Sequence, residues 1–182
     1  MFSRVILFAL IIVMSGCSAG VKSYKAVIEE DILRNAKGVE VKPIVDSLVF
    51  VNKYTVQQVT DYWIAKEQCG GNIDTLINYL QRIKMDSSHG QYKWFKWELG
   101  RARELKANDK DEVLYEVVKA YYTTELPANK GKSSVLAYYI IHNGQVVGTS
   151  SEKDLQSTAQ IGKSPIFAYE YIQYKFENPE LP

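Results

Sequence analysis

Apolar side chains recur every three or four residues in the first half of the chain, which is the period of an amphipathic helix. Thr55 and Asn72 stand just before two of these runs and are residue types that cap helix N-termini. Gly70 and Gly71 separate the same two runs, so we expect a helical hairpin there. The predicted helices lie within residues 24–37, 55–69 and 72–84.

β-branched and aromatic residues dominate other apolar segments, as is typical of strands. Asn143-Gly144 lies between two such segments and is a strong signal for a tight hairpin turn. Pro43 lies in the earliest one and suits an edge strand or a bend, because proline has no backbone donor for a sheet partner. We predict strands within residues 39–51, 113–124, 135–141 and 146–149.

Two aromatic segments fit both periods. Residues 91–106 align their apolar side chains either as a helix or as a strand, and Gly100 weakens both interpretations. We favour a strand at the aromatic start of this segment. Residues 166–176 alternate as a strand does, although Ser164-Pro165 would equally begin a helix. Here we expect a last, aromatic strand.

These segments together predict one α+β domain over residues 24–182. Its N-terminal helices, including the helical hairpin, would pack on a C-terminal, mostly antiparallel sheet. The total length of 182 residues suits a single domain. Fold class alone selects no function.

The N-terminus follows a different pattern. Residues 1–4 contain Arg4 and no acidic side chain, and residues 5–14 are ten positions without a polar side chain. Ten helical residues span about 15 Å, half of the roughly 30 Å of a bilayer core. We therefore interpret this segment as the core of a signal peptide and not as a membrane span.

The four residues Met14-Ser15-Gly16-Cys17 resemble the lipobox of bacterial lipoproteins, with Met14 where leucine is usual. The resemblance covers the export segment alone. It implies removal of residues 1–16, diacylation of the Cys17 sulfur with palmitate-like chains, and acylation of the new amino terminus, which is more than stable anchoring needs. Residues 17–23 would then be the lipidated cysteine and a short tether. The alternative is an ordinary secretory signal in which Cys17 happens to fall at the cleavage point.

Ser18 bears on the destination of the lipoprotein. In Gram-negative lipoproteins an Asp at this position commonly retains the protein in the inner membrane. The resemblance thus implies the periplasmic face of the outer membrane if the host is Gram-negative. Six residues separate Cys17 from the first predicted helix at Tyr24 and reach at most ~20 Å, so we expect the domain close to its membrane.

Composition excludes several classes of partner. The 22 Lys and Arg residues against 21 Asp and Glu, without basic blocks, provide no electrostatic basis for binding nucleic acid. Gly131-Lys132-Ser133 ends like a phosphate-binding loop, but Leu126 stands where its first glycine should be, so we expect no nucleotide. The spacing of His, Cys and acidic residues matches no metal-binding motif, and no cofactor is implied.

Few side chains are candidates for catalysis. Cys69 is placed at a helix C-terminus, where the helix dipole disfavours a thiolate. His89 and His142 lie in or beside loops and have no partner at helical or strand spacing. We assign no catalytic residue and expect that the protein is not an enzyme.

Aromatic content is the most unusual feature, with thirteen tyrosines and three tryptophans. Tyr92, Trp94 and Trp97 are the candidate partner-binding surface, because amphipathic rings supply contact area at little entropic cost. The alternative, which the size of the domain favours, is that these rings close the core.

The sequence therefore predicts a lipid-anchored, non-catalytic cell-envelope lipoprotein. Its domain would bind another envelope component, most simply a protein, through the aromatic surface or an exposed strand edge. One alternative is an inhibitor or immunity protein whose acidic residues Asp109, Asp111 and Glu112 occlude a periplasmic hydrolase. A second alternative is a cell-envelope hydrolase.

Overall fold

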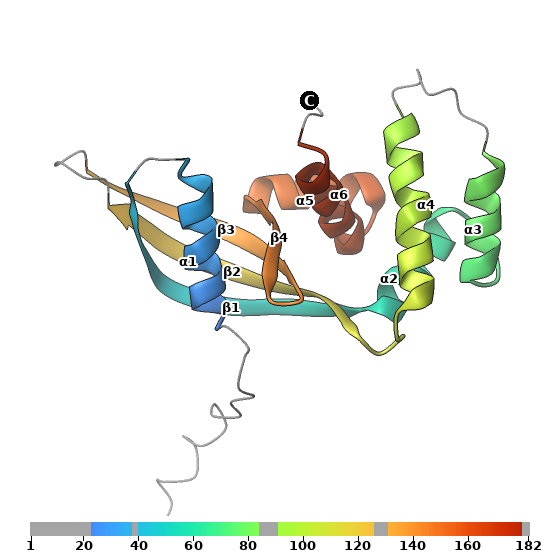
Figure 1. Cartoon of the computed structure of the whole chain (residues 1–182), viewed down its shortest axis with the longest axis horizontal. Helices are drawn as coiled ribbons and strands as arrows, with labels where there is room; N and C mark the ends of the chain where they lie inside the picture. The colour runs from blue at the N-terminus through green and yellow to red at the C-terminus, as the bar shows by residue number, and fades with distance from the viewer. Residues whose placement is uncertain (1–22, 38–39, 84–90, 126–130, 180–182) are drawn as a thin grey trace, which may run out of the picture.

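The computed structural model describes residues 23–37, 40–83, 91–125 and 131–179, so the predicted signal peptide, Cys17 and His89 lie outside the described residues. Within those ranges the chain forms an α+β domain with six helices and a four-stranded antiparallel sheet (Figure 1). The elements in chain order are α1 (Tyr24–Asn35), β1 (Lys42–Thr55), α2 (Val56–Lys66), α3 (Ile73–Arg82), α4 (Tyr92–Ala107), β2 (Val113–Glu125), β3 (Lys132–His142), β4 (Gln145–Ser150), α5 (Glu152–Gly162) and α6 (Pro165–Glu177).

The sheet has the order β1-β2-β3-β4, so β1 and β4 are its two edges. The predicted hairpin is confirmed, since β3 and β4 are joined by Asn143 and Gly144 with φ angles of 49° and 69°. Both angles are positive, as a two-residue turn that matches the twist of the strands requires. Pro43 lies near the start of the edge strand β1, where its missing donor is tolerated.

The predicted helix caps are also confirmed. The Thr55 hydroxyl accepts a hydrogen bond from the backbone N–H of Gln58 at 3.3 Å, and the Gln58 side chain accepts one from the Thr55 N–H at 2.9 Å. Asn72 Oδ1 accepts from the N–H groups of Asp74 and Thr75 at 3.0 and 3.1 Å. These short-range bonds explain why both starts are readable in the sequence.

The two strands expected in aromatic segments are wrong, because both segments are helices. In α4 the buried positions are Glu98, Arg101, Ala102 and Leu105, which is helical spacing despite the exposed Gly100. In α6 Ser164 caps the first turn and Pro165 occupies the first helical position. Both helices place aromatic rings on several sides, which is why their sequences also alternate. Helix α5, capped by Ser151, was not predicted.

The α+β class is confirmed in its coarse form, but the chain order is more mixed than predicted. β1 precedes α2, α3 and α4, and α5 and α6 follow the sheet. In Figure 1, α2, α3 and α4 gather at one end of the sheet, while α1 lies against its middle.

Helices cover both faces of the sheet, and each face has its own core. Val118 and Ala120 of β2 pack with Val27 and Ile28 of α1, so we name this side the α1 face. The alternate residue Val117 packs in a larger cluster with side chains from α2 to α6, on the side we name the α6 face. Tyr24 fastens α1 to the sheet, since its hydroxyl donates to Glu116 at 2.7 Å.

Candidate functional site

The middle of strand β1 is exposed to solvent. All eight residues from Asp46 to Lys53, which we name the exposed β1 segment, are exposed to solvent. Its apolar core is Leu48, Val49, Phe50 and Val51, with exposed fractions of 36, 57, 51 and 43%. Four consecutive large apolar residues are typical of a strand that is buried on both faces. Here they lie in the exposed middle of an edge strand.

Register assigns each of these side chains to a face. Leu48 and Phe50 pair with Ala120 and Val118, which lie on the α1 face. Val49 pairs with Lys119, whose ammonium lies 5.1 Å from the centre of the Tyr138 ring in the α6-face core. The apolar surface therefore continues on both sides of the strand.

Two β-bulges lie within the exposed β1 segment. The register between β1 and β2 shifts between Val45 and Ser47 and again between Phe50 and Asn52. Bulges are one means by which proteins restrict pairing at a free edge. The regular stretch Ser47–Phe50 between them remains available, and it contains three of the four exposed apolar residues.

The exposed surface extends across the sheet on the α6 face. Ser47 pairs with Tyr121, which in turn pairs with Leu136 of β3. Tyr121 and Leu136 are 41 and 46% exposed, so this end of the face is also uncovered.

The predicted partner-binding residues of α4 have a different environment. Trp94 and Trp97 stack on one another with ring centres 5.3 Å apart, and Trp94 meets Tyr174 of α6 edge-on at 4.7 Å. The Trp97 indole N–H donates to Glu177 at 2.8 Å. Both tryptophans and Tyr92 are half-buried, so they offer less free apolar surface than β1 does. Their role in binding a partner stays a prediction.

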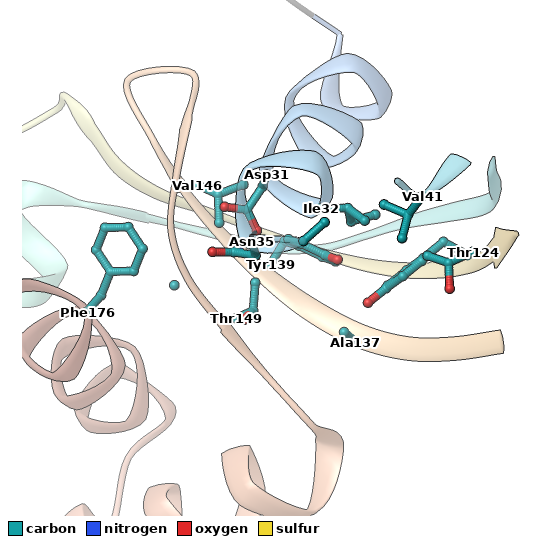
Figure 2. Close-up of a pocket in the computed structure, with 13 residues that line it drawn as sticks. Asp31, Ile32, Asn35, Val41, Thr124, Ala137, Tyr139, Val146, Thr149 and Phe176 are labelled. Carbon is teal, nitrogen blue, oxygen red and sulfur yellow. Dashed lines mark hydrogen bonds between the residues drawn. The ribbon is translucent and has the colours of Figure 1, made fainter. Parts of the chain in front are cut away.

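A pocket of about 530 Å³ lies between α1, the sheet and the end of α6 (Figure 2). Its walls combine apolar side chains such as Val146 and Phe176 with the polar groups of Asp31, Tyr139 and Thr149. Asp31 is 2% exposed and falls on the apolar face of α1, four residues after Val27. That spacing was a signal in the sequence that our reading did not use.

The charge of Asp31 is already compensated within α1. Its carboxylate accepts hydrogen bonds from Arg34 and, at 3.1 Å, from the Asn35 amide. Burial, with a hydrogen bond to Tyr122 and the negative charge of Asp31, raises the pKa of Tyr139 far above its ordinary value, so its phenol stays neutral. The pocket thus presents hydroxyl groups and a carboxylate that is already paired with Arg34.

A buried polar network joins four elements at the other end of the domain. Glu170 of α6 accepts from the Trp63 indole at 2.9 Å and from the Arg101 guanidinium of α4 at 3.1 Å. The Tyr115 hydroxyl of β2 accepts from Arg101 and lies within hydrogen-bond distance of Glu170 and Gln173, and its single proton is donated to one of these two. Because every member has a partner in the interior, we interpret this network as structural.

A second buried carboxylate, Glu98 of α4, is only partly satisfied. Its Oε1 accepts from the Lys66 ammonium at 3.0 Å, and its Oε2 has no hydrogen-bond partner among the residues that the structure describes. Burial raises the pKa of Glu98, although the charge of Lys66 opposes this. Burial also lowers the pKa of Lys66, but its bonds to Glu67 and Glu98 outweigh burial and raise it overall.

The remaining candidates for chemistry lie in separate elements. Cys69 follows the end of α2, and burial raises the pKa of its thiol, which disfavours a thiolate. The His142 Nδ1 atom lies 2.6 Å from the Leu114 carbonyl oxygen at the β3–β4 hairpin. The acidic turn at Asp109 is held against α2, because the Val56 N–H donates to the Glu112 carbonyl at 2.9 Å.

In the part of the chain that the structure describes, no three His, Cys, Asp or Glu residues are arranged to hold a metal ion. No helix there is both long and apolar enough to cross a bilayer. No protein family, curated protein or solved structure matches this chain.

Proposed function

We propose that this chain is a lipid-anchored, non-catalytic protein of the cell envelope whose domain binds another protein through the exposed β1 segment. The observation that carries the proposal is the exposure of Leu48–Val51 on an edge strand. A partner that covered these residues would gain the free energy of burying apolar surface, about 25 cal/mol per Å².

The chemistry of the edge favours a polypeptide partner. An edge strand offers unpaired backbone N–H and C=O groups, and an extended segment of another chain can pair with them. Alternate side chains of such a strand would contact Leu48 and Phe50 on one face and Val49 on the other. A small molecule or a sugar would use few of these backbone groups.

The anchoring part of the proposal rests on the lipobox-like sequence that ends at Cys17. Only six residues lie between Cys17 and α1, so a lipidated chain would hold its domain within ~20 Å of the membrane surface. The partner would then be another envelope protein, at the outer membrane in a Gram-negative host.

Site-specific photo-crosslinking tests the binding surface. Benzoylphenylalanine replaces Val49 in the full-length chain, and the control position is Ile161 of α5, which is 77% exposed. We expect a discrete protein adduct in membranes from position 49 and none from position 161. Equal labelling from both positions would contradict the proposal. An adduct from Asp111 but not from Val49 would instead favour the inhibitor alternative.

A further inference from the structure

We propose that the partner of the exposed β1 segment is a second copy of this chain, paired edge to edge and antiparallel about a two-fold axis at Val49. The inference rests on the proposed function, because it names the partner of the same surface. The result would be a continuous eight-stranded sheet made from two copies of the four-stranded one.

Geometry restricts the registers that such a pair can adopt. In a continuous antiparallel sheet the two-fold axis is perpendicular to the sheet, so residues that face each other lie on the same face. Leu48 and Phe50 of one copy must therefore face α1-face residues of the other copy. Val49 must face an α6-face residue of the other copy. An axis at Val49 satisfies both conditions.

This register is chemically self-complementary. Val49 faces Val49, Leu48 faces Phe50 twice, and Ser47 faces Asn52 when the bulged residue Val51 is passed over. Apolar side chains therefore meet apolar ones, and a hydroxyl meets an amide. No like charges face each other in this stretch.

The flanking charges favour the antiparallel direction. Asp46 precedes the apolar stretch and Lys53 follows it, so antiparallel pairing brings the acidic end of each strand beside the basic end of the other. The two side chains lie on opposite faces, since Asp46 accepts from Thr123 at 2.9 Å while Lys53 pairs with Glu116 on the α1 face. Their attraction therefore acts at longer range than an ion pair and sets direction more than affinity.

The arrangement also suits two anchors in one membrane. Rotation about an axis perpendicular to the sheet keeps the α1 face on the same side in both copies. Both α1 helices then lie on one side of the combined sheet, and six residues separate each of them from Cys17 in the sequence. A pairing that placed the two α1 faces on opposite sides would put the two α1 helices on opposite sides of the sheet, which does not suit anchoring to a single membrane surface.

Confinement to a membrane compensates for the small area of the contact between the two copies. Pairing of a few residues at a strand edge is a small interface compared with those of stable dimers. Anchoring both copies to one surface raises their effective concentration, as a short linker does. We expect the dimer in the membrane and a largely monomeric protein after detergent dilution.

Cysteine crosslinking in intact membranes tests the pairing and its register. The full-length chain carries Cys69→Ala, and Val49→Cys is added to it. Directly opposed residues of antiparallel strands have Cα atoms about 4.5–5.5 Å apart, within the range of a disulfide. Mild oxidation with copper phenanthroline should yield a species of twice the monomer mass. The matched controls are Ile161→Cys and Cys69→Ala alone, which should stay monomeric.

Two further variants test the register. Leu48→Cys and Phe50→Cys should crosslink when the two variants are co-expressed and poorly when each is expressed alone. Val49→Lys should abolish the dimer, because two ammonium groups would then face each other at the axis.

Each outcome separates the two proposals. If Val49→Cys crosslinks no better than Ile161→Cys, the self-pairing is wrong. A photo-adduct of a different mass from position 49 would then leave the proposed function standing with another protein as partner. If neither crosslinker captures a protein, both proposals fail.

Discussion

Arg101 of α4 and Glu170 of α6 form a bidentate ion pair in the interior of the domain. Arg101 Nε lies 3.2 Å from one carboxylate oxygen and Nη2 lies 3.1 Å from the other. The two side chains are 2 and 0% exposed. This pair ties the two helices that the sequence pattern left ambiguous to the same buried network.

Replacing Arg101 with Met should destabilise the fold by about 3–5 kcal/mol, because Glu170 would lose the only buried cation that pairs with it among the described residues. Urea denaturation followed by circular dichroism measures the change. Arg103→Met, on the exposed side of the same helix, is the control and should change the free energy of unfolding by less than about 0.5 kcal/mol. Equal effects of the two substitutions would show that breaking the buried pair costs no more stability than losing an exposed charge.

Two glycines should respond in opposite directions to alanine. A Cβ atom at Gly148 of β4 would lie 2.3 Å from Ile172 Cγ2, so Gly148→Ala should cost about 1–3 kcal/mol. Gly100 of α4 has no atom within 4 Å of such a Cβ, and Gly100→Ala should stabilise the helix by about 0.5–1 kcal/mol. Thermal unfolding of both variants measures the two effects. Adding Ile172→Ala to Gly148→Ala should restore part of the loss, and a loss that persists unchanged would place its cause elsewhere.

Glu98 should make the stability depend on pH. Because burial raises the pKa of Glu98, the folded state binds its proton more tightly than the unfolded state does. The free energy of unfolding therefore falls as pH rises from the ordinary carboxyl pKa through the raised one.

Glu98→Gln removes this titration. The free energy of unfolding of the variant minus that of the unchanged protein should be larger at about pH 7 than at about pH 4. Urea titrations at the two pH values measure the difference. The control Glu40→Gln replaces an exposed carboxylate and should show no comparable change between them. A Glu98→Gln effect that is the same at both values would contradict the assignment.

Trp94 distinguishes the two interpretations of the aromatic residues of α4. If its contacts with Trp97 and Tyr174 are core packing, Trp94→Ala should lower the free energy of unfolding by about 3 kcal/mol. A partner surface would instead lose binding without losing stability. Denaturation and the Val49 photo-crosslinking yield, measured on the same variant, separate these results.

Local signals account for most of what was predicted correctly. Thr55 and Asn72 bond to backbone groups within three residues, and Asn143-Gly144 adopts positive φ angles that the residue types themselves favour. Such features need no distant partner, so they are visible in a single sequence.

The strand predictions for the two aromatic segments were wrong for a physical reason. Helix α6 has aromatic rings on several sides, because Tyr169 contacts Tyr54 of β1 while Tyr174 contacts Trp94 of α4. A helix packed on more than one side loses its single apolar stripe, and its sequence then also fits the period of a strand. Ser164-Pro165 was the better signal, since a cap acts locally.

The sequence by itself determined the helix caps, the hairpin and the α+β class in its coarse form, because each depends on neighbouring residues, and it predicts the export-type N-terminus on the same local basis. Tertiary structure alone decided which apolar residues are covered. Pro43 suited an edge strand or a bend, but only the order of the sheet shows that β1 is an edge and that Leu48–Val51 are exposed on it. Arg101 and Glu170 belong to residue types that are mostly exposed, yet the packing of α4 on α6 buries them together. Exposure depends on contacts between segments far apart in the chain, which no local pattern encodes.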